Sequence, residues 1–123
     1  MLPAAHRLTR PEDFREVFRR GVSAGGSRVV LHWLRGDDST RDLDPGAPVR
    51  IGFVASKKVG NAVMRHRVKR QLRHVMRERL EEFPPGARVV VRCLPAAAGS
   101  TSGDFACELD RLINKARERS GSR

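Results

Sequence analysis

The spacing of hydrophobic and polar residues along the chain predicts three helices and three strands. Apolar residues that recur every three or four positions indicate a helix with one buried face, and alternating or short continuous apolar runs indicate a strand. The first helix is predicted to begin at the capping box of residues 9–12 (TRPE) and to end at Gly21. It places Phe14, Val17 and Phe18 on one face.

Three further segments have strand patterns. Residues 27–35 carry apolar side chains in both alternating sets, which is typical of a strand covered at least partly on both faces. Residues 49–55 predict a second strand. Residues 87–93 (ARVVVRC) predict a third, whose continuous apolar centre indicates a buried interior position. Residues 36–48 predict a solvated connection, and their aspartates match no Ca²⁺-binding spacing: Asp37, Asp38, Asp42 and Asp44.

The longest helical pattern extends from Asn61 to Glu82, before the Pro84-Pro85-Gly86 sequence. Its predicted core face consists of Met64, Val68, Leu72, Val75 and Met76. A last helix is predicted from about Ser102, and its core face consists of Phe105, Leu109, Leu112, Ile113 and Ala116.

The element order is therefore α-β-β-α-β-α, which predicts the α+β class. We expect a single domain over residues 1–123, folded as an α-β sandwich in which helices cover a small sheet. The ordered core is expected at about residues 8–116, followed by a frayed basic C-terminal tail over residues 117–123.

The charge of the chain restricts its partners. Lys and Arg number 25 against 14 Asp and Glu, a formal net charge of +11. A polyanion relieves such self-repulsion, so the partner is expected to be a nucleic acid or an anionic membrane surface. No apolar run approaches the roughly 18 residues that span a bilayer, and residues 1–7 lack the apolar region of a secretory signal. We therefore expect a cytoplasmic nucleic-acid-binding protein without a membrane partner.

Residue types that support metal or acid–base chemistry show no convincing pattern. Cys93 and Cys107 stand alone, and we interpret them as small apolar residues in a reducing cytoplasm. The four histidines form no metal-ligand spacing with them, so no structural zinc is expected. No pair of His or carboxylates suggests a protein-only nuclease.

The candidate binding segment is residues 57–79, which hold a single acid, Glu78, among nine basic residues: Lys57, Lys58, Arg65, Arg67, Lys69, Arg70, Arg73, Arg77 and Arg79. On a helix, His66, Arg70, Arg73 and Arg77 form a ridge opposite the core face. A surface helix usually balances such cations with Glu at i+4. A merely solvated face is the simplest interpretation of a charge run, but a one-signed, Arg-rich ridge favours phosphate binding.

Two neighbouring features could extend this surface. Lys57 and Lys58 precede a helix N-terminus, where an anion is favoured, although Gly60 and Asn61 are equally explained by a tight turn and an N-cap. Phe14 and Phe18 lie one turn apart on the first helix. Such a pair is more often core, but on a cleft floor the two rings could stack on unpaired nucleotides.

Residues 56–73 (SKKVGNAVMRHRVKRQLR) closely resemble the characteristic segment of the bacterial ribonuclease P protein component. Residues 14–18 (FREVF) followed by Gly21, the element order and the length are also similar to that family, over about residues 8–116. The resemblance implies a left-handed βαβ crossover around the basic helix, against the general right-handed rule.

The resemblance also implies a function. In that family a large catalytic RNA cleaves the 5′ leader from precursor tRNA with Mg²⁺, and the protein binds both RNAs, so the protein is a subunit of an endoribonuclease whose chemistry resides in RNA. No dedicated protein metal site and no small-molecule cofactor are expected. Residues expected to contact the catalytic RNA are Arg65, His66, Arg67, Lys69, Arg70, Arg73 and Arg77. Residues expected to contact the leader are Phe14, Phe18, His32, Lys57, Lys58 and Asn61.

Two positions depart from the family pattern. His66 stands where the family usually has Asn between two arginines, and His32 stands where an aromatic residue is common; His still hydrogen bonds and stacks. Two alternatives stay open from the residues alone: a structural RNA-binding protein of ribosome type, and a DNA-binding module. The strand before Lys57 argues against a helix-turn-helix.

Overall fold

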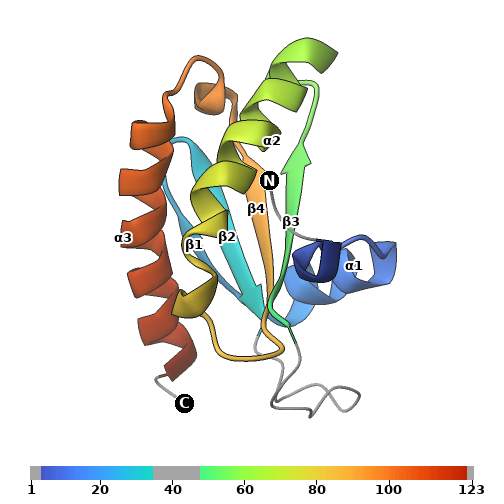
Figure 1. The fold of residues 1–123 in the computed structure, drawn as a ribbon, viewed down its shortest axis with the longest axis vertical. Helices are drawn as coiled ribbons and strands as arrows, with labels where there is room; N and C mark the ends of the chain where they lie inside the picture. Colours follow the sequence, from blue (N-terminus) through green and yellow to red (C-terminus); the bar gives the residue numbers. More distant parts are fainter. Residues whose placement is uncertain (1–3, 35–47, 122–123) are drawn as a thin grey trace.

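A four-stranded mixed sheet in the order β1-β2-β4-β3 forms the centre of the molecule (Figure 1). The strands are β1 (Val22–Gly25), β2 (Val29–Leu34), β3 (Arg50–Ala55) and β4 (Arg88–Cys93). The α-helices are α1 (Pro11–Arg20), α2 (Ala62–Arg77) and α3 (Ser102–Gly121), with short 3-10 turns η1 (Ala4–His6), η3 (Leu80–Glu82) and η4 (Pro95–Ala97). This computed structural model describes residues 4–34 and 48–121.

Helices cover the two faces of the sheet unequally. In Figure 1, α2 and α3 lie in front of the sheet, and their apolar faces join one large core that contains Trp33, Val89 and Phe105. On the other face α1 packs on a smaller cluster, in which Val17 lies with Leu8, Leu34 and Val90. Alternate residues of β2 and β4 therefore face different helices, and the α1 face has the smaller cover.

The crossover from β3 through α2 to β4 is left-handed. β3 and β4 pair in parallel, Arg50 with Arg88 through Ala55 with Cys93. In Figure 1 both strands run upward, α2 passes in front of them, and the chain moves from right to left. This confirms the handedness that the family resemblance implied, in a fold that is an exception to the usual rule.

The structure adds one strand to the predicted order and shifts several boundaries. β1 was missed because its sequence, VSAG, is short and Gly-flanked, and only its pairing with β2 makes it a strand. Helix α1 has Arg10 at the N-cap with no side-chain cap hydrogen bond, so the predicted capping box does not form. Helix α3 continues to Gly121, beyond the predicted end of the core at about residue 116. The aspartate-rich segment 36–47 lies outside the described residues.

A buried carboxylate holds the turn between β1 and β2 against α3. Glu108 is 3% exposed and accepts hydrogen bonds from the backbone N–H groups of Arg28 (2.8 Å) and Val29 (2.9 Å), the Ser27 hydroxyl (3.1 Å) and the Arg28 guanidinium (3.2 Å). A Cβ at Gly26 would lie 2.4 Å from its Oε2 atom, so this turn needs glycine there. The missed strand is thus positioned by a residue some 80 positions away.

Candidate nucleic-acid interface

The turn between β3 and α2 presents two lysines on a rigid base. Val59 is buried and its N–H bonds the Ser56 carbonyl, while Lys57 and Lys58 are exposed. Gly60 has φ 154°, and a Cβ there would crowd Met64 at 3.0 Å. The Asn61 side chain accepts a hydrogen bond from the Met64 N–H at 2.9 Å, so Asn61 acts as the N-cap of α2.

Helix α2 divides into the two faces that the sequence predicted. Val68, Leu72, Val75 and Met76 are buried, and Met64 packs partly against them. His66, Arg67, Arg70, His74 and Arg77 are exposed, whereas Arg65, Lys69 and Arg73 are partly buried. The predicted ridge is therefore on the surface over nearly its whole length.

Within residues 4–34 and 48–121, the α2 cations from Arg65 to Arg77 form no ion pair with a carboxylate. Arginines that do form one lie elsewhere: Arg10, Arg20, Arg28, Arg79, Arg88 and Arg117. Arg73 instead stacks its guanidinium over the Phe53 ring of β3 at 6.0 Å from the centroid. Nε of Arg65 is buried with no hydrogen-bond partner in this part of the chain.

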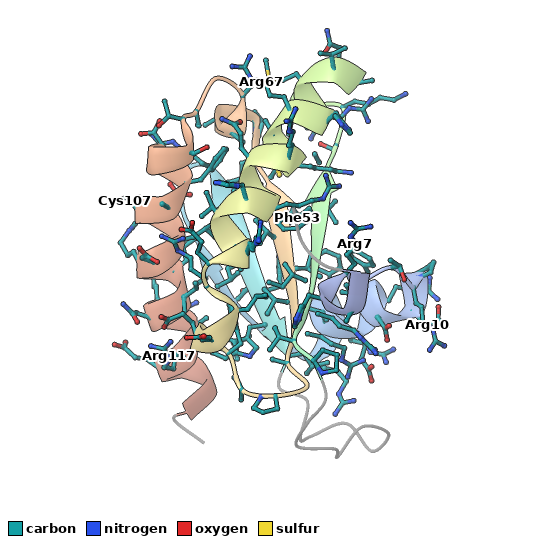
Figure 2. The ribbon with its side chains drawn as sticks, viewed as in Figure 1. Arg7, Arg10, Phe53, Arg67, Cys107 and Arg117 are labelled. Carbon is teal, nitrogen blue, oxygen red and sulfur yellow. The ribbon has the colours of Figure 1, made fainter. Side chains whose placement is uncertain are left out.

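A groove lies between this face of α2 and the beginning of α3. It has a volume of about 680 Å³ and is lined by His66, Arg67, Arg70, Gln71, Arg73, His74 and Ser102. The Gln71 amide donates to the Ser100 carbonyl at 3.1 Å and so ties the two walls together. Figure 2 shows Arg67 near the upper end of α2 and Phe53 on β3 beside that helix. The groove has guanidinium and imidazole groups but no carboxylate in its lining.

On the opposite face of the sheet, Phe14 and Phe18 have different roles. The Phe14 ring packs against Gly52, where a Cβ would lie 2.4 Å from the ring, so Phe14 is largely a packing residue. Phe18 is 41% exposed and meets the His32 ring edge-on at 4.7 Å. Burial, together with the nearby Arg92 charge, lowers the pKa of His32, so its ring is neutral at pH 7. Phe18 and His32 thus form a partly exposed aromatic surface.

Beyond α1 this face has an open row of three paired residues. Arg92 of β4 lies between Val30 of β2 and Val54 of β3, and Arg92 is exposed while the valines are half-buried. The row lies close to the strand end that leads into Lys57. Arg92 was missed because the continuous apolar centre of ARVVVRC was interpreted as the sign of a buried interior strand. Its period of two, which places Arg88, Val90 and Arg92 on one face, was the available signal.

The cysteines and metal-ligand residues are not part of either surface. Cys93 is buried, and burial raises the pKa of its thiol to about 11, as expected for an inert packing residue. Cys107 is exposed on α3. In the described part of the chain no group of three or more His, Cys, Asp or Glu could hold a metal ion, and no helix could cross a membrane.

Sequence comparisons link the chain to a characterised family. The family described as Ribonuclease P matches residues 2–117. The ribonuclease P protein component of Nocardioides sp. is 45% identical over 113 residues, which cover 92% of this chain and 92% of that protein. The corresponding protein of Streptomyces avermitilis is 45% identical over 116 residues, covering 94% of each.

Solved structures show the same fold. The RNase P protein from Staphylococcus aureus superposes with a TM-score of 0.75 at 21% identity, over 91% of this chain and 95% of that one. The RNase P protein from Thermotoga maritima superposes with a TM-score of 0.71 at 23% identity, over 89% and 96%. The predicted α+β sandwich is therefore confirmed.

Proposed function

Because the chain belongs to the ribonuclease P protein family, the protein subunit of a metal-dependent endoribonuclease that works with an RNA subunit, we propose that it divides two RNA contacts between opposite faces of its sheet. Helix α2 binds the catalytic RNA. The Phe18–His32 surface, with the lysines before α2, binds the single-stranded 5′ leader of precursor tRNA. The protein acts in the cytoplasm and performs no bond cleavage of its own.

The proposed contact between α2 and the catalytic RNA is supported by one observation: along α2, the cations have no carboxylate partner among the described residues. Cations at i, i+3 and i+4 repel one another unless an anion lies between them. RNA phosphates supply that anion, and each pairing releases condensed counterions. The proposed contacts are Arg65, His66, Arg67, Lys69, Arg70, Arg73 and Arg77. Arg73 is oriented by the Phe53 ring.

The leader contact is proposed for the open part of the α1 face. Phe18 offers an exposed ring and His32 a neutral one, and unpaired bases stack on such rings without regard to sequence. Arg92 in the open row joins Lys57 and Lys58 as a cation for the leader phosphates. Phe14 packs on Gly52, and Asn61 acts through the cap that fixes the start of α2.

We propose Mg²⁺ as the metal of the reaction, held by the RNA and not by this protein. Magnesium prefers carboxylate, phosphate and water oxygens. The proposed surfaces carry guanidinium, ammonium and imidazole groups, and the nearest carboxylates on the α1 face, Asp13 and Glu16, are engaged by Arg88 at 3.2 and 2.6 Å. These residues do not fit a magnesium site. Their role is to neutralise phosphates that would otherwise repel one another.

The direct test is multiple-turnover cleavage of precursor tRNA by the cognate RNA subunit at low Mg²⁺, with and without the protein. We expect stimulation by the protein, and none by a charge-reversed Arg67→Glu, Arg70→Glu variant. Arg111→Glu with Arg117→Glu is the matched control, because it makes the same change in net charge at two exposed positions of α3 outside the groove. Absence of stimulation by the wild-type protein would exclude the proposal.

The leader contact has a separate test. Phe18→Ala should weaken binding of leader-bearing tRNA by roughly 1–3 kcal/mol if a base stacks there, and leave binding of mature tRNA unchanged. Phe14→Ala, by contrast, should destabilise the fold, because the Phe14 ring packs on Gly52. Equal loss for tRNA with and without a leader would contradict the assignment of Phe18.

A further inference from the structure

The groove between α2 and α3 contains two histidines, His66 and His74, which distinguish it from an ordinary arginine-rich helix face. His66, Arg70 and His74 follow one another at intervals of four residues, so they lie in one stripe along α2. The stripe spans two helical turns, about 12 Å at 1.5 Å per residue. Both histidines are exposed and line the same groove. One guanidinium is thus flanked by two imidazoles along the groove.

No carboxylate of the described residues lines the groove; Glu78, four residues after His74, is exposed and lies 4.0 Å from the Arg79 guanidinium. The α2 wall adds Arg67, Arg73 and the amide of Gln71, and the α3 wall adds the Ser102 hydroxyl. The acid nearest in sequence to Ser102 is Asp104, whose carboxylate accepts the Thr101 backbone N–H at 3.0 Å and lies 4.0 Å from the Arg28 guanidinium. The hydrogen bond from Thr101 lowers the pKa of Asp104, which keeps this carboxylate charged and in its cap. An anion that enters the groove therefore meets only donors and cations.

From this geometry we propose that the groove is a proton-dependent phosphate site. It binds backbone phosphates of the catalytic RNA, and His66 and His74 take up protons as it does so. The proposal rests on the proposed RNA contact of α2 and specifies how that contact is regulated. Histidine is the side chain whose charge ordinarily changes between pH 5 and 8, and a phosphate within reach favours its charged form. Binding and protonation are then linked, so that each strengthens the other.

The test measures equilibrium binding of the catalytic RNA alone at pH 8, 7 and 6 and constant ionic strength. Wild-type protein is expected to bind roughly tenfold more tightly at pH 6 than at pH 8. The salt dependence of binding should steepen over the same range by about one to two phosphate contacts. These two readouts follow from uptake of charge in the groove and do not depend on catalysis.

Two paired variants separate the histidines from other titrating groups. His66→Asn with His74→Gln should bind at every pH with the weak affinity of wild type at pH 8. His66→Lys with His74→Lys should bind at every pH with an affinity close to that of wild type at pH 6. Both side chains are exposed, so neither variant should change thermal unfolding. A wild-type affinity independent of pH, or a pH dependence that survives in the Asn/Gln variant, overturns the proposal. Binding that is strong but insensitive to pH overturns the proton linkage and leaves the RNA contact standing; no binding at any pH overturns both.

Discussion

Arginines at the two ends of the α2–α3 pair have opposite surroundings. At the C-terminal end of α2, Arg79 bonds Asp110 of α3 at 2.7 Å, and nearby Arg117 of α3 bonds Glu82 at 2.7 Å. About two and a half to three turns earlier along α2, Arg70 and Arg67 line the groove and pair with no described carboxylate. Arg79 and Arg117 therefore stabilise the fold. The charges of Arg67 and Arg70 remain available for a binding partner.

The same contrast exists within a single strand. Arg88 and Arg92 lie four residues apart on one face of β4. Arg88 is held between Asp13 and Glu16 of α1, and its side chain is 12% exposed. Arg92 lies beyond the end of α1 and is exposed. Both positions hold an arginine on the same face of the same strand. The difference is that two carboxylates of α1 bind Arg88, whereas Arg92 lies beyond the end of α1. The neighbouring carboxylates therefore decide which arginine is structural and which is available for binding.

The largest expected effect comes from removing Arg88. Arg88→Ala leaves two partly buried carboxylates without their cation, and we expect a loss of about 2–4 kcal/mol in the free energy of unfolding. Arg92→Ala should change it by less than about 0.5 kcal/mol while weakening binding of leader-bearing tRNA. Urea unfolding and tRNA binding of both variants measure this difference. If Arg92→Ala destabilised the protein as much as Arg88→Ala, exposure would not distinguish the two roles.

The charge of Glu108 gives a pH-dependent test of the contacts that stabilise the fold. Burial alone would raise the pKa of this carboxyl, but hydrogen bonds from the Arg28 and Val29 amides, Ser27 and the Arg28 side chain hold it below its usual value. Because the pKa is lower in the folded state, this stability is present above the unfolded pKa and is lost as pH falls through the folded pKa. Glu108→Gln should cost roughly 1–3 kcal/mol at pH 7.

The measurement is urea unfolding of wild type and Glu108→Gln at a series of pH values from 7 to 3. Glu16 also has a lowered pKa, chiefly because Arg88 donates to it, so both proteins lose stability in acid. The quantity of interest is therefore the difference between them, which should shrink as pH falls. A constant difference would show that the Glu108 charge does not contribute.

An effect on RNA affinity without an effect on stability is expected for Arg70→Glu. The change should weaken binding of the catalytic RNA roughly tenfold or more and reduce the salt slope by about one to two contacts. The free energy of unfolding should stay constant or rise by a few tenths of a kcal/mol, because repulsion among neighbouring cations is relieved. Arg111→Glu, at an exposed position of α3, makes the same charge change away from the groove. A comparable loss of RNA affinity in this control would show that the effect comes from the change in net charge and not from the position of Arg70.

Periodicity was enough to predict most of the fold, because amphipathic segments have few ways to bury their apolar faces. The core face of α2 and the helix from Ser102 were predicted from spacing alone. β1 was not, since its four residues become a strand only through pairing with β2 and through the turn that Glu108 fixes. The handedness of the crossover was available only from the family resemblance.

For the candidate site, sequence located the cations but not their partners. Nothing near Arg79 in the sequence indicates that Asp110 lies 2.7 Å from its guanidinium, and nothing near Arg88 indicates its two acids on α1. In the same way, the spacing placed Phe14 and Phe18 on one face of the first helix and did not distinguish them. The structure does, because the Phe14 ring packs on Gly52 and the Phe18 ring is exposed. Long-range contacts decide which members of a charged or aromatic run are available to a ligand.

The smallest expected effect is also the sharpest test of that principle, because Arg77 and Arg79 belong to one basic run. Arg79→Ala removes a bidentate contact to Asp110 and a hydrogen bond to the Val75 carbonyl, but Asp110 is 58% exposed. Solvent screening limits the loss of stability to about 0.5–1 kcal/mol, and RNA affinity should hardly change. Arg77→Ala, two residues earlier and exposed, should leave stability unchanged and weaken RNA binding by roughly two- to threefold. Thermal unfolding and RNA titration of the two variants decide the matter. If Arg79→Ala cost as much RNA affinity as Arg77→Ala, a carboxylate of the same chain would not withdraw an arginine from the RNA surface, and the division into structural and binding cations would fail.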